Sequence, residues 1–171
     1  SIAVVGPNSN QTVFGDYSWT TPDTKEGVTL YQGLQQVLGK KKTILQADGC
    51  NWWNRADSKD IEQAVKAVEQ RDLAIVVGTR STFLGRGPRY STAGEGFDLS
   101  SLELPGNQSE LLKAVKATGK PMIVVLISGK PLVMSWAKEN ADAVLVQWYA
   151  GEQEGSSIAD ILFGKTNPSG H

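Results

Sequence analysis

The stretch from Met122 to Ile127 reads M-I-V-V-L-I, and it decides the fold. Six apolar residues in a row, with no polar residue between them, are typical of a central strand that is covered on both faces. Helices cover both faces when strands and helices alternate along the chain, because each helix then carries the chain back to start the next parallel strand. We therefore expect apolar runs and amphipathic runs to alternate on both sides of this stretch.

The expected alternation runs through the whole chain. Strands are predicted at residues 2–5, 43–47, 73–77, 122–127 and 143–147. Helices are predicted from Leu30 to Leu38 with Gly39 at the end, from Ser58, from a capping box of Asn107 and Glu110 to Gly119, from Pro131, and from Ser157 to Phe163. The pattern predicts a single α/β sandwich domain over residues 1–171, with a doubly wound, mainly parallel sheet and helices on both faces.

Five loops are predicted to leave the carboxyl ends of the strands, where an open parallel sheet binds its ligands. They begin at Gly6, Asp48, Gly78, Ser128 and Trp148. The loop after Gly78 is the longest, because about thirty residues separate that strand from the next helix, several times the usual length of such a connection. A loop of this length at a strand end is typical of a binding or catalytic segment.

Composition narrows the functional classes. The 171 residues include 40% hydrophobic and 20% charged side chains with a formal net charge of −1, which is ordinary for one globular domain. No basic excess indicates nucleic-acid binding, and no apolar run is long enough to span a membrane. Cys50 is the single cysteine, and we expect it to be a small buried side chain rather than part of a disulfide or a metal cluster.

The usual function of such a sheet is nucleotide binding, and the motifs argue against it. The first strand is followed by G-P-N-S-N, and neither G-x-G-x-x-G nor G-x-x-x-x-G-K-[ST] occurs. The sequence therefore contains no motif that would indicate a flavodoxin-like nucleotide-binding protein. The only histidine, His171, is the last residue, which argues against histidine-based catalysis.

Carboxylate chemistry is the remaining catalytic reading. Glu95 lies between Gly94 and Gly96 in the long loop, so its side chain is sterically accessible and the backbone can bend to project it into a cleft. A solvated loop glutamate is the alternative, and the residues alone favour it. Asp98 is placed to orient the loop or to bond to Glu95, although an aspartate that forms a turn is the commoner explanation.

Aromatic residues in the loops offer a second signal. Trp19, Tyr17, Trp52 and Trp53 are of the kind that forms flat platforms for sugar rings, because the C–H faces of a sugar pack well on aromatic faces. The alternative is that they pack under loops or against a neighbouring domain. The residues themselves favour neither reading.

Seven motifs in order resemble one family, the C-terminal α/β sandwich domain of glycoside hydrolase family 3, the β-glucosidases and β-xylosidases. They are I-A-V-V-G-P-N at 2–8, G-E-G-F-D-L-S-S-L-E-L-P-G at 94–106, A-T-G-K-P at 117–121, S-G-K-P-L at 128–132, W-Y-A-G-E-Q-E-G at 148–155, I-A-D-I-L-F-G at 158–164 and N-P-S-G at 167–170. Each motif is weak alone, but the resemblance runs nearly end to end.

The resemblance implies a role for each site residue. Members are retaining glycosidases whose nucleophile is an Asp on a preceding (β/α)8 barrel, while the second domain provides the general acid/base. Glu95 matches that acid/base, and Trp19 matches an aromatic residue that flanks the sugar in some members. Asp98 shares the motif of Glu95. Leu99 stands where the family usually has Arg, and a leucine cannot form a salt bridge that would fix the loop.

The expected function is therefore that of the second domain of an exo-acting β-glucosidase or β-xylosidase. The partners would be a β-linked oligosaccharide or glycoside and the enzyme's own barrel; no cofactor or metal is expected. The chain begins at Ser1 without a starting methionine and lacks a last family strand, so we expect it to be a piece of a longer protein. A secreted or periplasmic parent would carry its signal elsewhere. The alternative function is a non-catalytic carbohydrate-binding or interaction module.

Overall fold

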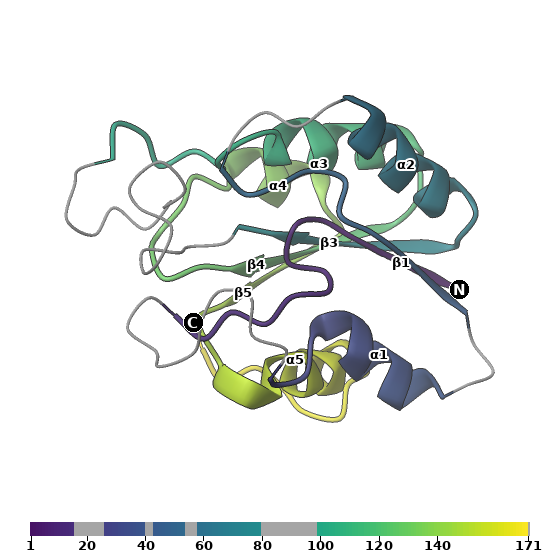
Figure 1. Cartoon of the computed structure of the whole chain (residues 1–171), viewed down its shortest axis with the longest axis vertical. Helices are drawn as coiled ribbons and strands as arrows, with labels where there is room; N and C mark the ends of the chain where they lie inside the picture. The colour runs from purple at the N-terminus through teal and green to yellow at the C-terminus, as the bar shows by residue number, and fades with distance from the viewer. Residues whose placement is uncertain (16–25, 40–42, 54–57, 80–98, 171) are drawn as a thin grey trace.

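A computed structural model describes residues 1–15, 26–39, 43–53, 58–79 and 99–170. Within these residues the strands form one five-stranded sheet in which every pairing is parallel (Figure 1). The strands are β1 Ile2–Val5, β2 Ile44–Ala47, β3 Leu73–Gly78, β4 Met122–Ile127 and β5 Ala143–Gln147. All five predicted strands are confirmed, and each begins and ends within a residue of its predicted position.

The helices cover both faces of the sheet, as predicted for an α/β sandwich. They are α1 Leu30–Leu38, α2 Ser58–Glu69, α3 Gln108–Ala117, α4 Ser135–Asn140 and α5 Glu154–Leu162, with a 3-10 turn η2 at Gly151–Gln153. In Figure 1, α1 and α5 lie on one side of the sheet, and α2, α3 and α4 lie on the other. None of the helices in the described residues is both long and apolar enough to cross a membrane.

The strand order is β2-β1-β3-β4-β5. After β1 the chain turns to β2 on one side, and it then returns to place β3 on the other side of β1. In a doubly wound sheet, this reversal opens a crevice beyond the carboxyl ends of the two strands, and ligands bind there. The loops that follow β1 and β3 therefore leave the sheet beside the expected binding region.

Gly6 allows the first of these loops to leave the sheet against β3. Its φ of 112° lies in the left-handed region, and a Cβ at this position would come within 2.2 Å of the Val77 carbonyl oxygen. Only glycine fits such a close approach without strain. As a result, the Asn8 N–H donates to the Val77 carbonyl across 3.4 Å, and the chain crosses the end of β3 directly after β1.

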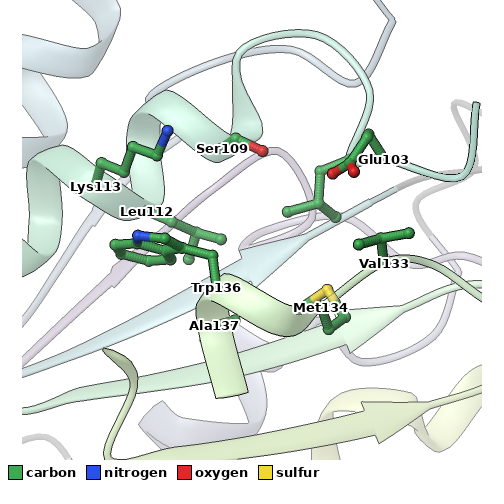
Figure 2. Close-up of a pocket in the computed structure, with 9 residues that line it drawn as sticks. Glu103, Ser109, Leu112, Lys113, Val133, Met134, Trp136 and Ala137 are labelled. Atoms are coloured by element: carbon green, nitrogen blue, oxygen red, sulfur yellow. The ribbon is translucent and has the colours of Figure 1, made fainter. Parts of the chain in front are cut away.

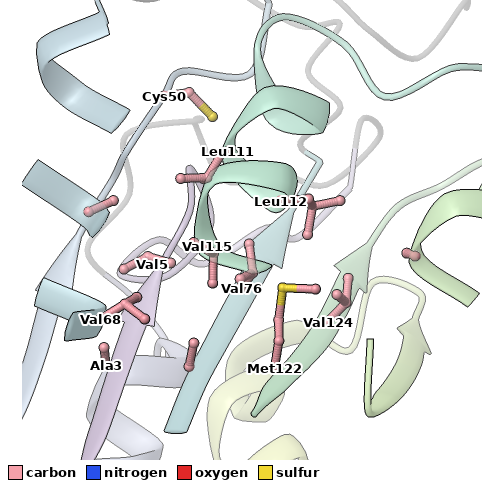
Figure 3. Packing of buried hydrophobic residues seen from close by; sticks show 13 residues of the cluster. Ala3, Val5, Cys50, Val68, Val76, Leu111, Leu112, Val115, Met122 and Val124 are labelled. Atoms are coloured by element: carbon pink, nitrogen blue, oxygen red, sulfur yellow. The ribbon is translucent and has the colours of Figure 1, made fainter. Parts of the chain in front are cut away.

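Two apolar clusters hold the layers together, one on each face of the sheet. Alternate residues of the same strand belong to different clusters: Val76 and Val124 face α2 and α3, whereas Ile75 and Val125 face α1 and α5. Figure 3 shows the first cluster, in which side chains of α3 pack over the strands. A strand buried on both faces needs apolar residues at every position, which explains the unbroken run of β4.

The predicted capping box at the start of α3 is wrong, although the helix begins directly after Asn107, as predicted. The side chain of Asn107 makes no capping hydrogen bond, so the predicted box at α3 is absent. A complete capping box begins α1 instead: Thr29 accepts from the Gln32 N–H, and the Gln32 side chain accepts from the Thr29 N–H. The prediction of the box failed because Glu110, three residues after Asn107, also fits the helical pattern of an ordinary exposed residue.

The predicted start of α4 at Pro131 is wrong, because residues 131–134 are not helical. Ser128 organises a turn, because its hydroxyl donates to the Lys130 carbonyl and accepts the Lys130 N–H. The Val133 N–H donates to the Leu102 carbonyl at 2.8 Å, a partner outside the helix. These bonds commit the backbone of this segment elsewhere, so α4 starts only at Ser135 and has six residues.

Candidate functional site

The candidate site lies at the crevice between β1 and β3, where the strand order reverses. Trp19 belongs to the loop that follows β1, and Glu95 and Asp98 belong to the long loop that follows β3. All three residues lie outside the described residues, so their positions stay predictions. The structure does describe where each loop leaves the sheet and where it returns. These two loop bases are close to each other, because the Asn8 side-chain amide donates to the Gly78 carbonyl at 3.3 Å.

The base of the first loop is tied at several points. The Thr12 hydroxyl donates to the Glu26 carbonyl at 2.9 Å, which joins the two ends of the loop. The Thr29 hydroxyl donates to the Asn10 side chain at 3.0 Å, and the Tyr31 N–H donates to the Ser9 carbonyl at 3.1 Å. These bonds fix both ends of the segment that carries Trp19 against the start of α1.

Glu154 also supports this base, although its role was not predicted from the sequence. It is the first residue of α5 and is completely buried, and its Oε2 accepts the Val13 N–H at 3.2 Å. Burial raises the pKa of Glu154 to about 8, against a smaller opposite effect of the bond from Val13. Because its carboxyl group keeps a proton near neutral pH, it can be buried at a tolerable cost.

The spacing of residues along α5 indicates that Glu154 is buried. Glu154 precedes the buried Ile158 by four residues, so both lie on one face of α5. We instead predicted a loop to Gly155 and a helix from Ser157. The helix begins three residues earlier, which moves Glu154 from a loop into the interior. Glu152, two residues before it, is exposed.

The base of the long loop has an unusual backbone. Thr79 follows β3 with a φ of 55°, and it is the single non-glycine residue with positive φ among the described residues. A β-branched residue rarely adopts this conformation. Its hydroxyl donates to the Ile127 carbonyl and its N–H donates to the Gln108 side chain, and both Thr79 and Gln108 are buried.

The returning end of the long loop is described from Leu99 onward. Leu99 is about one-third exposed (36%), and as an apolar side chain it cannot form the ion pair expected of an arginine. Glu103 is exposed. Leu104 packs against the cluster between α2, α3 and the sheet. The loop is therefore attached to the body of the domain before α3 begins.

A separate cavity of about 140 Å³ lies between α3 and α4. Its walls are mainly apolar, and Figure 2 shows Leu112 and Lys113 of α3 with Trp136 of α4 at this cavity. Glu103 and Lys113 are its charged lining residues. A single carboxylate without a second one or a nucleophile beside it gives no catalytic pair.

The structure describes three further residues that the sequence singled out, Cys50, Trp52 and Trp53. Cys50 is buried, as expected, and burial, together with the charge of Asp48, raises the pKa of its thiol to about 12. Trp52 and Trp53 are half-buried and meet edge to face with ring centroids 4.5 Å apart. No group of three or more His, Cys, Asp or Glu side chains in the described part of the chain is arranged to hold a metal ion.

Comparison with known proteins adds the family context. The sequence profile of the glycosyl hydrolase family 3 C-terminal domain matches residues 1–171. A beta-xylosidase of Formosa agariphila is 34% identical over 99% of the chain, and a periplasmic beta-glucosidase of Salmonella typhimurium is 34% identical, also over 99%. The chain spans 23% and 24% of the lengths of these relatives.

Solved structures give the same result for the fold. A beta-glucosidase from Listeria innocua in complex with isofagomine superposes with a TM-score of 0.78 and 28% identity over 98% of this chain. A family 3 beta-glucosidase from Bifidobacterium adolescentis superposes with a TM-score of 0.78 and 28% identity over 96%. This chain corresponds to 22% and 23% of those chains. The α/β sandwich is thus one part of each larger enzyme.

Proposed function

The chain belongs to the C-terminal domains of glycosyl hydrolase family 3, and we propose that it is the second domain of a retaining β-glycosidase. The match to the family over residues 1–171 carries the proposal, because it includes both loops beside the crevice between β1 and β3. Relatives that contain a domain of this kind bear the names beta-xylosidase and beta-glucosidase. The proposed substrates are accordingly β-glucosides or β-xylosides, cleaved from one end.

Three residues would act on the substrate. Glu95 is the proposed general acid/base. Trp19 is the proposed aromatic residue that flanks the sugar, and Asp98 is proposed to orient the loop of Glu95. The topology supports this grouping, since Trp19 and Glu95 lie in the two loops that the sheet brings together at one edge. No cofactor is needed, because two carboxyl groups suffice for retaining hydrolysis.

The second carboxyl group would come from an Asp on a (β/α)8 barrel that precedes the chain. In the first step, that Asp attacks the anomeric carbon, the glycosidic bond breaks, and Glu95 transfers its proton to the leaving oxygen. In the second step, the Glu95 carboxylate takes a proton from water as the water displaces the Asp and releases the sugar. The two carboxyl groups of such a pair stand roughly 5–5.5 Å apart, so the domains would meet at the site.

Apolar side chains exposed at two other places on the domain support contact with another domain. Large side chains that are more than about two-fifths exposed there include Leu102, Val133, Val146 and Trp148. Leu102 and Val133 are adjacent through a backbone hydrogen bond, and Val146 and Trp148 belong to β5 and the residues that follow it. Apolar surface of this kind is costly in water and is typical of interfaces.

The acid/base role is tested in the full-length enzyme by Glu95→Ala. Glycosylation by an alkyl glycoside needs a proton for its poor leaving group, so kcat/KM should fall about 10²–10⁴-fold. Glycosylation by a dinitrophenyl glycoside needs no proton and should be nearly unchanged. Glu103→Ala removes an exposed carboxylate eight residues later in the chain and is the matched control. Equal losses on both substrates would assign Glu95 a structural role instead.

The need for a partner domain is tested with the 171-residue chain alone. Because the nucleophile lies elsewhere, the purified chain should not hydrolyse nitrophenyl β-glucoside or β-xyloside. Measurable turnover would contradict the division of the site between two domains. Titration with glucose or xylose addresses the alternative: tight binding that is unaffected by Glu95→Ala would favour a carbohydrate-binding module.

A further inference from the structure

Gln108 links the two ends of the long loop. It is the first residue of α3, where the loop ends, and its Oε1 accepts the N–H of Thr79, where the loop begins. The N–H donor fixes which way the amide is turned, because an NH2 group in that place would face another donor. Gln108 is 2% exposed and Thr79 is 3% exposed, so water does not compete for this bond.

Thr79 is held from a second direction as well. Its hydroxyl donates to the carbonyl of Ile127, the last residue of β4. The end of β3, the end of β4 and the start of α3 are therefore joined through one residue. A β-branched side chain at a φ of 55° persists only where its surroundings determine it, and these two hydrogen bonds supply that determination.

Space filling does not explain Gln108. Its Nε2 is buried and has no hydrogen-bond partner among the described residues. It lines a narrow space with apolar neighbours, which include Pro7, Leu111 and Leu126. An apolar side chain would fill that place without leaving a buried donor unsatisfied, which is unfavourable. The acceptor that Gln108 offers to Thr79 is the one property that an apolar residue lacks.

The returning end of the loop is fixed independently. The Leu102 carbonyl accepts the Val133 N–H at 2.8 Å, and Leu104 packs into the cluster above the sheet. The loop thus has an anchor at each end, and the anchor at its start includes one side chain from α3. A shift at that anchor would be transmitted along the chain to the residues that follow Thr79.

We propose that Gln108 and Thr79 form a clasp that positions the Glu95 loop, which makes Gln108 a positioning residue for proton transfer. The inference rests on the proposed function, since it assigns the acid/base role to Glu95. Proton transfer requires the acid to lie within hydrogen-bond reach of the leaving oxygen, and a displacement of about 1 Å can cost about 10²-fold in rate. The clasp would act through geometry and would not touch the substrate.

The test compares Gln108→Met with Gln108→Glu in the full-length enzyme. Met keeps the length of the side chain and removes the acceptor, whereas Glu keeps an oxygen that can accept the Thr79 N–H. Values of kcat/KM are measured with an alkyl glycoside and with a dinitrophenyl glycoside of the same sugar. Gln108→Met should lose about 10–100-fold on the alkyl glycoside and less than about 3-fold on the dinitrophenyl glycoside. Gln108→Glu should recover most of the loss below neutral pH.

Equal losses on both substrates, or a lowered Tm with unchanged selectivity, would overturn the clasp. Glu95→Ala is measured in parallel to separate the two proposals. If Glu95→Ala does not discriminate between the substrates, the proposed function fails; if it does and Gln108→Met does not, only the clasp fails. Should Gln108→Met not fold, Thr79→Val against Thr79→Ser tests the other bond that holds Thr79, because only the serine keeps the hydroxyl that donates to Ile127. Thr79→Val should show the same selective loss on the alkyl glycoside, and equal losses on both substrates would overturn the clasp.

Discussion

The two sides of the sheet differ in how completely this chain covers them. On the side of α1 and α5, two glycines allow the helices to pack backbone to backbone. A Cβ on Gly155 would lie 2.0 Å from the Thr29 carbonyl oxygen, and one on Gly33 would lie 2.2 Å from the Gly155 carbonyl oxygen. The Gly155 N–H also donates to the Val28 carbonyl at 2.8 Å. This layer has no room left for another element at the crossing.

The other side is open over β5. Val144 and Val146 pair in register with Val124 and Leu126 of β4 and therefore face the layer of α2, α3 and α4. That layer ends in the six-residue α4, which is too short to cover the edge strand, and Val146 is 53% exposed. The contrast teaches that, among the described residues, one layer is closely packed at its helix crossing, whereas the other leaves apolar side chains of β5 exposed.

Gly155→Ala is the strongest way to break the closed side. Glycine to alanine within a helix normally stabilises by about 1 kcal/mol. Here the added methyl group overlaps the Thr29 carbonyl oxygen, so we expect a loss of more than about 3 kcal/mol in the free energy of unfolding. Urea denaturation of the 171-residue chain measures it. Gly119→Ala, with no atom within 4 Å of the added Cβ, should cost only about 1 kcal/mol; equal losses would contradict the close crossing.

The buried carboxyl group predicts the next largest effect, a dependence of stability on pH. The pKa of Glu154 is raised from 4.5 to about 8 in the folded chain, so its contribution to stability is complete below pH 4.5 and is lost as the pH rises through 8. Glu154→Gln keeps an acceptor for Val13 and cannot ionise. The variant should gain about 4 kcal/mol over the parent chain between pH 5 and pH 9, since the shift spans roughly three pH units of this window and each unit corresponds to about 1.4 kcal/mol.

Urea denaturation at the two pH values measures this difference. Glu152→Gln removes an exposed carboxylate two residues away and should leave the pH dependence unchanged. If Glu154→Gln and the parent chain lose the same stability between pH 5 and pH 9, the carboxyl group does not titrate as its burial implies.

The capping box of α1 gives a smaller effect on the same side. Thr29→Ala removes the acceptor for the Gln32 N–H and the donor to Asn10, and it should destabilise the chain by about 1 kcal/mol. Thr29→Ser retains the hydroxyl and should stay close to the parent. Thermal denaturation monitored by circular dichroism distinguishes the two variants. A Thr29→Ser variant as unstable as Thr29→Ala would show that the hydroxyl is not responsible.

The open side should tolerate change best. Val146→Thr places a hydroxyl on a surface that water already reaches, so the stability of the 171-residue chain should change by less than about 0.5 kcal/mol. Val124→Thr, on the same face but buried, should cost about 1–3 kcal/mol. In the full-length enzyme, a larger loss for Val146→Thr would indicate that another domain covers it. Similar losses for both variants in the chain alone would contradict the contrast.

The strands were predictable because burial on both faces demands an unbroken apolar run, and few other structures tolerate one. Helix starts were less predictable, since they depend on bonds to distant segments. The Val133 N–H bonds to Leu102, about thirty residues away, and no local pattern reveals that a helix cannot begin at Pro131. Likewise, nothing local distinguishes Asn107, which makes no capping bond, from Thr29, which does.

The site was predictable in its location and only partly in its residues. Strand order places the loops of Trp19 and Glu95 at one edge of the sheet, as the alternation implied. Their side chains, with that of Asp98, lie outside the described residues, so their roles stay predictions. Gln108, Thr79 and Glu154 were not found from the sequence because each is polar and buried. Their partners are backbone groups between 29 and 141 residues away.

The buried thiol of Cys50 can report unfolding of the domain, because its reaction with an alkylating reagent requires exposure. Alkylating reagents attack the thiolate, and a pKa of about 12 leaves almost none of it in the folded chain at pH 8. In the unfolded chain the same thiol reacts readily. Because the chain has one cysteine, each modified molecule gains a single mass increment, and mass spectrometry would count the molecules that have opened. Ordinary iodoacetamide thus records rare excursions from the native state without any engineered label.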